Sequence, residues 1–501
     1  MHEKEIRRLA YKQLKAIPAF RRLKRKEKKN ISQKILDDIL EVYNFKDPVT
    51  SKLNELTATT NIEAMRGLMT LSDMQSLIEY TQRKIIKMPS AMRSKHLKDP
   101  ELLLIDDLLD NSIINKLLAW EEYTPSQHVL FPCQLLRAEL LKSLKFPELS
   151  YRRFCKEQVR PLSLAANRVF IGLPINRNQN ITHGQLSTFR KHLEFRQLCN
   201  LMVYIICLLF QSKAFDHSFR LAGIDSTDLA AFCNPRPLAT IEMPDGKKVR
   251  IYNELDADCG KRRKKRDKSE FFVGYRLHTL TAINPKTGQI CPLLTLAAPA
   301  NHHDSLFTDQ LVAWAQAIGL ELNLVVGDDA YGVPVTTEAI YDKHEVRVVT
   351  PPRPKVEVPD HVAAAGHHVF AHEFCETPMT YLGYDKQGHE FKCAAEPGEC
   401  SHAAVCSQSR HIPVDSGLFG QIPEIVNQVS ELRNLRKHLE RGNNLLKHRE
   451  GLEPLRVHSL QGVSVVATFA TIANLLIEIA GHRKTPKKEC PQLDLPLAEA
   501  A

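Results

Sequence analysis

Two short apolar runs, each followed directly by an aspartate, constrain the fold of this chain more than any other feature. They are Leu221-Ala-Gly-Ile-Asp225 and Leu322-Asn-Leu-Val-Val-Gly-Asp328. Apolar runs of this length, bounded by polar residues, are typical of strands buried on both faces. Functional residues of such sheets gather where the strands end, so we expect both aspartates at one edge of a sheet.

Further apolar segments, separated by turn residues, follow these two runs and predict additional strands and helices. Additional strands are expected at residues 271–283, 290–296 and 346–350. Helices are expected from Asp304, as the N-cap, to Ile318, and again near residues 335–341. The pattern predicts an α/β domain with a mixed sheet and flanking helices.

The segments before this domain have a different residue pattern. Residues 1–125 and 126–220 show helical apolar spacing, so two helical regions are expected before the α/β domain at 221–482. Within that domain, an irregular insertion is expected at about 351–422, after Pro351-Pro-Arg-Pro. A long charged helix is then expected from Pro423 to about Arg449, followed by an apolar helix. Residues 483–501 are expected to be a disordered tail.

Positive charge is concentrated in two blocks. The formal net charge is +10, and residues 1–30 hold twelve Lys and Arg against three Glu. A second block, Lys261-Arg-Arg-Lys-Lys-Arg-Asp-Lys268, lies between two expected strands. Such blocks attract polyanions, nucleic acid above all, although a solvated face or a flexible tail would look the same.

The chain is expected to be cytoplasmic and to have no membrane partner. Residues 1–14 alternate charged and apolar side chains and lack the apolar core of a secretory signal. The apolar run 463–480 is interrupted by Asn474 and Glu478, which favours a buried helix over a membrane span. Twelve cysteines without an export signal indicate a reducing compartment and no disulfides.

Two carboxylates held together at one sheet edge repel each other unless cations lie between them. Hard divalent ions with oxygen ligands relieve this repulsion, and two of them about 4 Å apart can drive phosphate chemistry. A third carboxylate is offered by Glu440, which shares one helix face with Arg436, Asn444 and Lys447. The alternative for Glu440 is an ordinary Arg–Glu pair on a solvated helix.

Several stretches, in this order, resemble the insertion-sequence transposases that carry an Asp–Asp–Glu triad. Ile224-Asp225-Ser-Thr resembles the first catalytic strand, and residues 272–278 and 298–304 resemble the hairpin and the helix start after it. Val326-Gly-Asp328-Asp-Ala-Tyr331 resembles the second catalytic strand, where the ligand stands three residues before a tyrosine. This spacing favours Asp328 over Asp329.

The charged helix resembles the family signature Tyr-x2-Arg-x3-Glu-x6-Lys at Arg436, Glu440 and Lys447. It departs from the signature at position 433, where an arginine replaces the tyrosine. The resemblance covers residues 132–193 and then the chain to about 481, while the first hundred or so residues match nothing in the family. It implies an α/β, ribonuclease H-like mixed sheet with flanking helices, preceded by all-helical N-terminal domains and carrying an irregular insertion.

The resemblance further implies metal-dependent cutting of transposon ends and joining of these ends to target DNA. The catalytic and metal-binding residues would be Asp225, Asp328 and Glu440, with two Mg²⁺ ions for which Mn²⁺ can substitute. Double-stranded DNA would be the partner, bound by a homodimer, and the protein would be nucleoid-associated when bound. The predicted DNA-binding residues are Arg436, Lys447, Arg441, Lys261, Arg262 and Arg263.

The expected insertion contains a group of cysteines and histidines. Cys393, Cys400 and Cys406 are candidates for a Zn²⁺ site, but the spacing contains no C-x2-C pair, and free thiols are the alternative. His278 and Asp304 are explained without function, as a hairpin residue and a helix cap. Three other functions remain open: a nuclease of the same fold that does not join strands, a DNA-binding regulator derived from a transposase, and a zinc-stabilised scaffold.

Overall fold

The computed structural model describes most of the chain from residue 3 to residue 484. The described residues are 3–15, 27–28, 30–35, 68–84, 95–119, 130–175, 179–215, 219–242, 246, 248–263, 269–284, 289–350, 371–372, 375–385, 388–393, 399–402, 404, 409–412, 434–449 and 451–484.

The centre of the protein is a mixed six-stranded sheet with the order β6-β5-β1-β7-β8, in which β4 also pairs with β5. Strands β6, β5 and β1 are antiparallel neighbours, whereas β7 and β8 run parallel to β1. The strands are β1 (Leu221–Ala230), β4 (Asp258–Arg263), β5 (Ser269–Ile283), β6 (Ile290–Pro299), β7 (Leu324–Val326) and β8 (Arg347–Val349). The predicted strands at 271–283, 290–296 and 346–350 are thus confirmed.

One strand boundary was predicted wrongly. β1 does not end at Asp225 but continues to Ala230. The extension is paired to β5, whose residues Gly274 to Thr279 lie opposite Ala230 to Asp225. Only the parallel partner β7 stops early, which leaves Asp225 on a strand that has a neighbour on one side.

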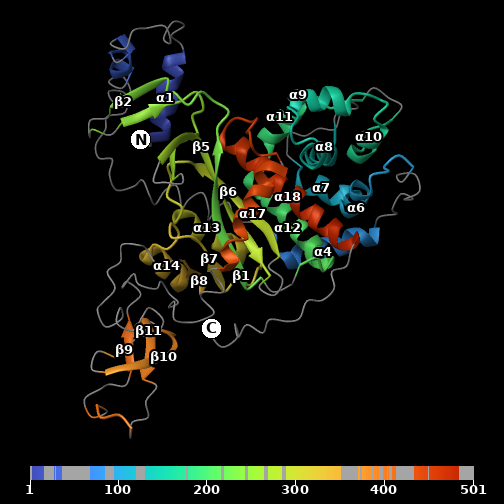
Figure 1. Ribbon diagram of the computed structural model, residues 1–501. Helices are drawn as coiled ribbons and strands as arrows, with labels where there is room; N and C mark the ends of the chain where they lie inside the picture. Colours follow the sequence, from blue (N-terminus) through green and yellow to red (C-terminus); the bar gives the residue numbers. More distant parts are fainter. Residues whose placement is uncertain are drawn as a thin grey trace.

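Helices surround the sheet (Figure 1): α13 (Leu306–Ala317) and α14 (Pro334–His344) pack in the same large core as the helical block, and the Trp314 ring of α13 lies 5.3 Å from the Phe195 ring of that block. The helices before the sheet are α1 (Glu3–Lys15), α4 (Leu71–Lys84), α6 (Pro100–Leu108), α7 (Asn111–Leu117), α8 (Pro132–Lys145), α9 (Tyr151–Phe154), the π-helix η2 (Cys155–Val159), α10 (Ala165–Ile171), α11 (His183–His192) and α12 (Phe195–Gln211). Among the described residues before β1, all regular structure is helical, as predicted.

A single large hydrophobic core joins the helical block to the sheet. It contains Ile105 of α6, Leu136 of α8, Ile205 of α12 and Ile224 of β1. Helices on either side of residue 125 therefore pack in the same core. The longest helix, α18 (Leu460–Lys484), contributes Phe469 and further residues to it. α18 is long and apolar enough to cross a membrane, but 78% of its apolar stretch is buried inside the protein, as a core helix requires.

A smaller unit forms at the N-terminus. Helix α1 packs on the hairpin of β2 (Ala239–Glu242) and β3 (Lys248–Ile251), where Ala10 and Leu14 meet Ile241 and Val249. A buried ion pair between Arg7 and Asp258, 2.7 Å apart, joins the same helix to β4. The basic N-terminal segment is thereby attached to the edge of the main sheet.

The insertion is not irregular throughout, which corrects the prediction. It contains a separate four-stranded sheet of order β12-β11-β10-β9, in which all neighbouring strands are antiparallel and which lies apart from the main body in Figure 1. The segment from Thr377 to Tyr384 is rich in threonine and tyrosine, residue types that are enriched in strands. The strands are β9 (Ala371–His372), β10 (Cys375–Asp385), β11 (Gly388–Cys393) and β12 (Ser409–Ile412).

Candidate active site

Asp225 and Asp328 occupy equivalent positions on two neighbouring strands. The last parallel pair between β1 and β7 joins Gly223 to Val326. Each aspartate follows its member of this pair by two residues, so both stand just beyond the same edge of the parallel part of the sheet. The sheet register therefore brings the two carboxylates together, as the two apolar runs predicted.

Asp225 is a partly buried carboxylate with two hydrogen-bond donors. The Ser226 backbone N–H donates to Oδ1 at 2.9 Å, and the Asn443 side-chain amide donates to Oδ2 at 2.9 Å. Burial, reinforced by the charges of Asp328 and Glu440, raises the pKa of Asp225 to about 7. This site holds negative charge at a free-energy cost that a cation would offset.

Asp328 begins a turn directly after β7. Its Oδ1 accepts from the Ala330 N–H at 3.0 Å, and its carbonyl accepts from the Tyr331 N–H at 3.2 Å. Burial raises the pKa of Asp328, and the neighbouring charge that raises it most is that of Asp304. Asp329, the other candidate ligand, is exposed.

The helix that carries Glu440 reaches the sheet because residue 223 is a glycine. A Cβ on Gly223 would stand 2.4 Å from Leu439 Cδ2, closer than two carbon atoms can approach. Leu439 is buried in a small cluster with Leu221 and Val326 at this point. Gly223 thus permits α17 (Leu439–Asn444) to lie directly against β1.

The predicted continuous helix to Arg449 is wrong in its described part, and residues 423–433 lie outside the described residues. A short helical segment at 434–436 is separated from α17 by a turn at Lys437 and His438, and α17 passes into the π-helix η4 (Leu445–Arg449). Gly442, Asn443 and Asn444 are weak helix formers, which accounts for the short regular stretch. π-Helical turns are frequent at functional sites.

Glu440 lies in the first turn of α17, near the two aspartates but on the exposed side of the helix. Its charge and the charge of Arg436 both act on Asp225, and Arg436 also lowers the pKa of Asp328. Within the described part of the chain, no three His, Cys, Asp or Glu side chains are grouped closely enough to hold one metal ion. The predicted triad of Asp225, Asp328 and Glu440 is therefore not gathered around one metal position, although the charge of Glu440 acts on Asp225.

Asn443 was not predicted, yet it is the α17 side chain that contacts Asp225 directly. It is buried, whereas Asn444 on the predicted helix face is exposed. The sequence signal was weak, because two consecutive asparagines cannot be distinguished by spacing when the direction of the helix is unknown.

A second acidic pair next to the aspartates is bridged by Arg276 of β5. Its Nε donates to Asp228 Oδ1 at 3.2 Å, its Nη1 to Asp304 Oδ1 at 3.0 Å, and its Nη2 to the Lys261 carbonyl at 3.0 Å. Asp304 was predicted to be the helix N-cap, and this is wrong. Ser305 holds that position, and the Asp304 side chain accepts a hydrogen bond from Arg276. The pairing of Asp228 with Arg276 across β1 and β5 sets this bridge.

His278 lies beneath the site in a fully buried position. Its Nδ1 is 3.2 Å from Tyr331 Oη, and its ring stacks on Phe307 with centroids 4.0 Å apart. Burial lowers the pKa of His278 to about 3, so the ring is neutral. Tyr331, the tyrosine three residues after Asp328, is therefore a packing partner of His278.

The predicted DNA-binding residues divide into two groups. Arg436, Lys447 and Arg262 lie near acidic residues of the site, since Lys447 and Arg262 both lower the pKa of Asp228. Lys447 also pairs with Glu453 at 2.8 Å, and Arg262 with Glu270 at 2.9 Å. Arg441 and Lys261 are exposed. Arg263 ends β4, but its side chain lies outside the described residues, as do residues 264–268.

The candidate zinc ligands are not gathered in the described residues. Cys393 and Cys400 are free and partly buried, and no group of metal-ligating side chains is found among the described positions of the insertion. Cys406 lies outside those positions. The zinc site thus stays a prediction.

No protein-family model matches the chain, and no curated protein matches its sequence. Among solved structures, the chain is similar to a piggyBac transposase in a synaptic complex with hairpin DNA, determined by cryo-EM. The identity is 10% and the TM-score 0.30, over 80% of this chain and 82% of the other. A similarity of this strength does not establish a shared fold or function.

Proposed function

We propose that this protein is a DNA transposase of the insertion-sequence type, with a ribonuclease H-like catalytic domain. It would hydrolyse a phosphodiester at each transposon end, free a 3′ hydroxyl, and join that hydroxyl to target DNA. The observation that carries the proposal is the equivalent placement of Asp225 and Asp328 beyond one sheet edge, with Glu440 and Arg436 close enough to act on Asp225.

The carboxylates suit a hard divalent cation. Asp225 and Asp328 are oxygen ligands whose negative charge is disfavoured by burial and by neighbouring acids. We propose that they hold two Mg²⁺ ions together with Glu440, and that Mn²⁺ can replace Mg²⁺. Bound ions of this kind activate a water and stabilise the leaving phosphate oxygen. A small shift of α17 would bring Glu440 nearer to the aspartates.

The residues around the carboxylates have complementary tasks in this proposal. Asn443 orients Asp225 through its 2.9 Å hydrogen bond, and Arg276 pairs with Asp228 and Asp304, which lie next to the metal ligands. Arg436, Arg441, Lys447, Lys261, Arg262 and Arg263 would contact DNA phosphates, whose neutralisation gives salt-dependent affinity. Both ends must be cut together, so the working form would be a homodimer on double-stranded DNA, cytoplasmic and nucleoid-associated.

The test uses DNA carrying the inverted repeats that flank the coding region. With Mg²⁺, the wild-type protein is expected to nick these ends and join them to a target plasmid, whereas Asp225→Ala is expected to bind the ends without cutting. Asp329→Ala, a change to an exposed neighbouring carboxylate, is the matched control and should retain cutting. Cutting by Asp225→Ala at the wild-type rate would exclude this active site.

The same assay separates the other functions. Pre-cut ends that are never joined to target DNA would indicate a nuclease of this fold. Binding of end DNA with no Mg²⁺-dependent cutting by the wild type would indicate a non-enzymatic regulator. Stoichiometric Zn²⁺ in the purified protein, with neither activity, would indicate a zinc-stabilised scaffold.

A further inference from the structure

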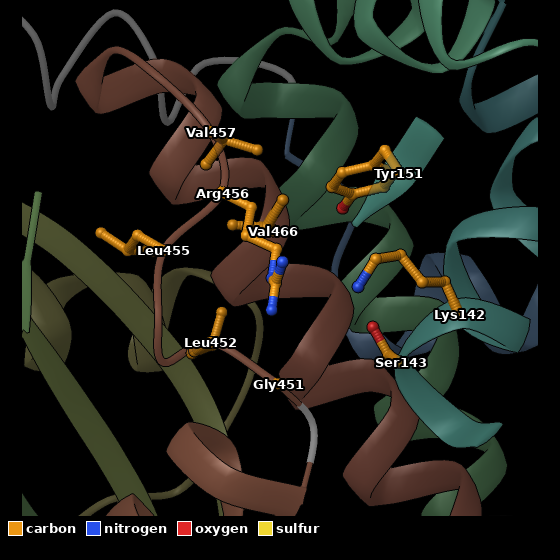
Figure 2. A pocket seen from close by; sticks show the side chains of 9 residues that line it. All are labelled: Lys142, Ser143, Tyr151, Gly451, Leu452, Leu455, Arg456, Val457 and Val466. Atoms are coloured by element: carbon orange, nitrogen blue, oxygen red, sulfur yellow. The ribbon is translucent and has the colours of Figure 1, made fainter. Parts of the chain in front are cut away.

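A small cavity lies where helix α8 meets the segment between η4 and α18, and none of the proposed metal ligands lines it. Figure 2 shows its lining, in which Lys142, Ser143 and Tyr151 come from the helical block and Gly451 to Val457 come from the connecting segment. Lys142 and Arg456 extend into it from opposite sides. Two positively charged groups therefore share a cavity that has no part in the proposed catalytic site.

Lys142 is a buried ammonium with weak compensation. It is only 5% exposed, its Nζ lies 3.5 Å from the Pro147 carbonyl, and it stands 4.9 Å from the centroid of the Tyr151 ring. The nearest buried carboxylate, Glu139, is already bound by Arg190 and by the Tyr151 hydroxyl. Burial, together with the charges of Arg456 and Arg190, lowers the pKa of Lys142 to about 8, and the charges of Glu139 and Glu148 only partly oppose this.

Arg456 has one donor without a hydrogen-bond partner among the described residues. Its Nη2 donates to the Glu148 carbonyl at 2.9 Å, but its buried Nε meets no acceptor in the part of the chain that the structure describes. No carboxylate of the described residues forms an ion pair with Arg456 or with Lys142. An unsatisfied buried donor is uncommon in native proteins and usually indicates a missing partner.

The backbone around the cavity is closely packed. Gly451 has a φ of +74°, and a Cβ at this position would stand 2.7 Å from Pro147 Cβ. The carbonyls of Pro147 and Glu148, which contact the two cations, belong to the loop that follows α8. Lys142 and Arg456 are thus both anchored to the backbone of one closely packed loop.

From this geometry we infer that the cavity between Lys142 and Arg456 is a binding site for a phosphate group. Its volume of about 20 Å³ has room for one or two water-sized groups. Two oxygens of a phosphate group match this size, and the rest of the group would remain in the open mouth of the cavity. One oxygen would accept from the free Arg456 Nε and the other from Lys142 Nζ, since such charge-assisted hydrogen bonds are the strong ones.

Occupancy would connect two distant parts of the chain. Arg456 follows η4, the continuation of the helix that carries Glu440, whereas Lys142 belongs to α8 of the helical block. A bound phosphate group would hold these two segments together. The group could be inorganic phosphate or a phosphate of the DNA backbone, and only the second source rests on the proposed function.

The first experiment measures thermal unfolding in inorganic phosphate against chloride of equal ionic strength. At a phosphate concentration about ten times its Kd, we expect the Tm of the wild type to rise by about 2 °C. Lys142→Met, which keeps the side-chain length and removes the charge, is expected to lose this rise. Lys156→Met, a change of an exposed lysine in the same block, should keep it, since general salt effects act on all variants.

The second experiment measures DNA affinity against salt concentration. If a DNA phosphate fills the cavity, Lys142→Met should lower the slope of log K against log[salt] by about 1, and Lys156→Met should leave it unchanged. Arg456→Gln serves both experiments if Lys142→Met does not fold, as judged by circular dichroism.

The two readouts together decide the inference. Loss of the phosphate-dependent Tm rise alone identifies free phosphate as the occupant, and a lower DNA salt slope identifies the DNA backbone. Equal Tm rises and equal salt slopes for the wild type and both cavity variants would overturn the inference that the cavity binds a phosphate group. If the protein binds no DNA, the proposed function fails and the Tm experiment still tests the cavity.

Discussion

Replacing Asp225 with asparagine should stabilise the metal-free protein while it abolishes cutting. The pKa of Asp225 is about 7 in the folded protein, against a reference value of 3.8. One pKa unit corresponds to about 1.4 kcal/mol, so ionised Asp225 lowers the free energy of unfolding by about 4 kcal/mol at pH 8. Asparagine has the same shape and carries no charge. Its oxygen can still accept from the Ser226 N–H, but its NH₂ group cannot accept from the Asn443 amide, which costs about 1 kcal/mol at both pH values.

The direction of the pH dependence follows from the raised pKa. The unfolded chain loses this proton near pH 4 and the folded protein near pH 7, so the folded state holds more protons between these values. The free energy of unfolding of the wild type therefore falls as pH rises from 4 to 7, and Asp225→Asn lacks this contribution. We expect the stability advantage of the variant over the wild type to grow by about 3 kcal/mol between pH 4.5 and pH 8.

The assay is urea unfolding in EDTA at both pH values, followed by circular dichroism. Asp329→Asn, at an exposed carboxylate one residue beyond Asp328, is the control and should show no comparable gain. Added Mg²⁺ is expected to stabilise the wild type more than the variant, and so to reduce the difference between their free energies of unfolding. A difference that is absent, or equal at pH 4.5 and pH 8, would refute the reasoning that Asp225 holds a disfavoured charge.

Two further predictions concern residues that position the site. Gly223→Ala should reduce Mg²⁺-dependent cutting by at least about tenfold, because its Cβ would displace Leu439 and with it α17. The double variant Gly223→Ala/Leu439→Ala should recover part of the activity, and Gly481→Ala, where nothing lies within 4 Å, should have no effect. Arg276→Met should lower the free energy of unfolding by about 2–3 kcal/mol in urea, because it leaves Asp228 and Asp304 unpaired. Arg276→Lys should not restore it, since one ammonium cannot reach both carboxylates and the Lys261 carbonyl, and full recovery would contradict this account.

The sequence alone determined five strands of the main sheet, β1, β5, β6, β7 and β8, and the neighbouring positions of the two aspartates. Apolar runs of strand length each ended in an aspartate, and a parallel arrangement of buried strands leaves those positions side by side. The same patterns placed the hairpin at residues 271–296 and the buried helix near the C-terminus. These features are local, because they depend on the alternation and length of apolar segments.

The tertiary structure alone decided how the helix with Glu440 meets the sheet. Gly223 allows the close approach, Asn443 rather than Asn444 reaches Asp225, and Glu440 stays at the exposed side. The Arg276 bridge and the cavity of Lys142 and Arg456 likewise join segments far apart in the chain. Such contacts depend on the direction and rotation of packed elements, which a residue pattern along one segment does not encode.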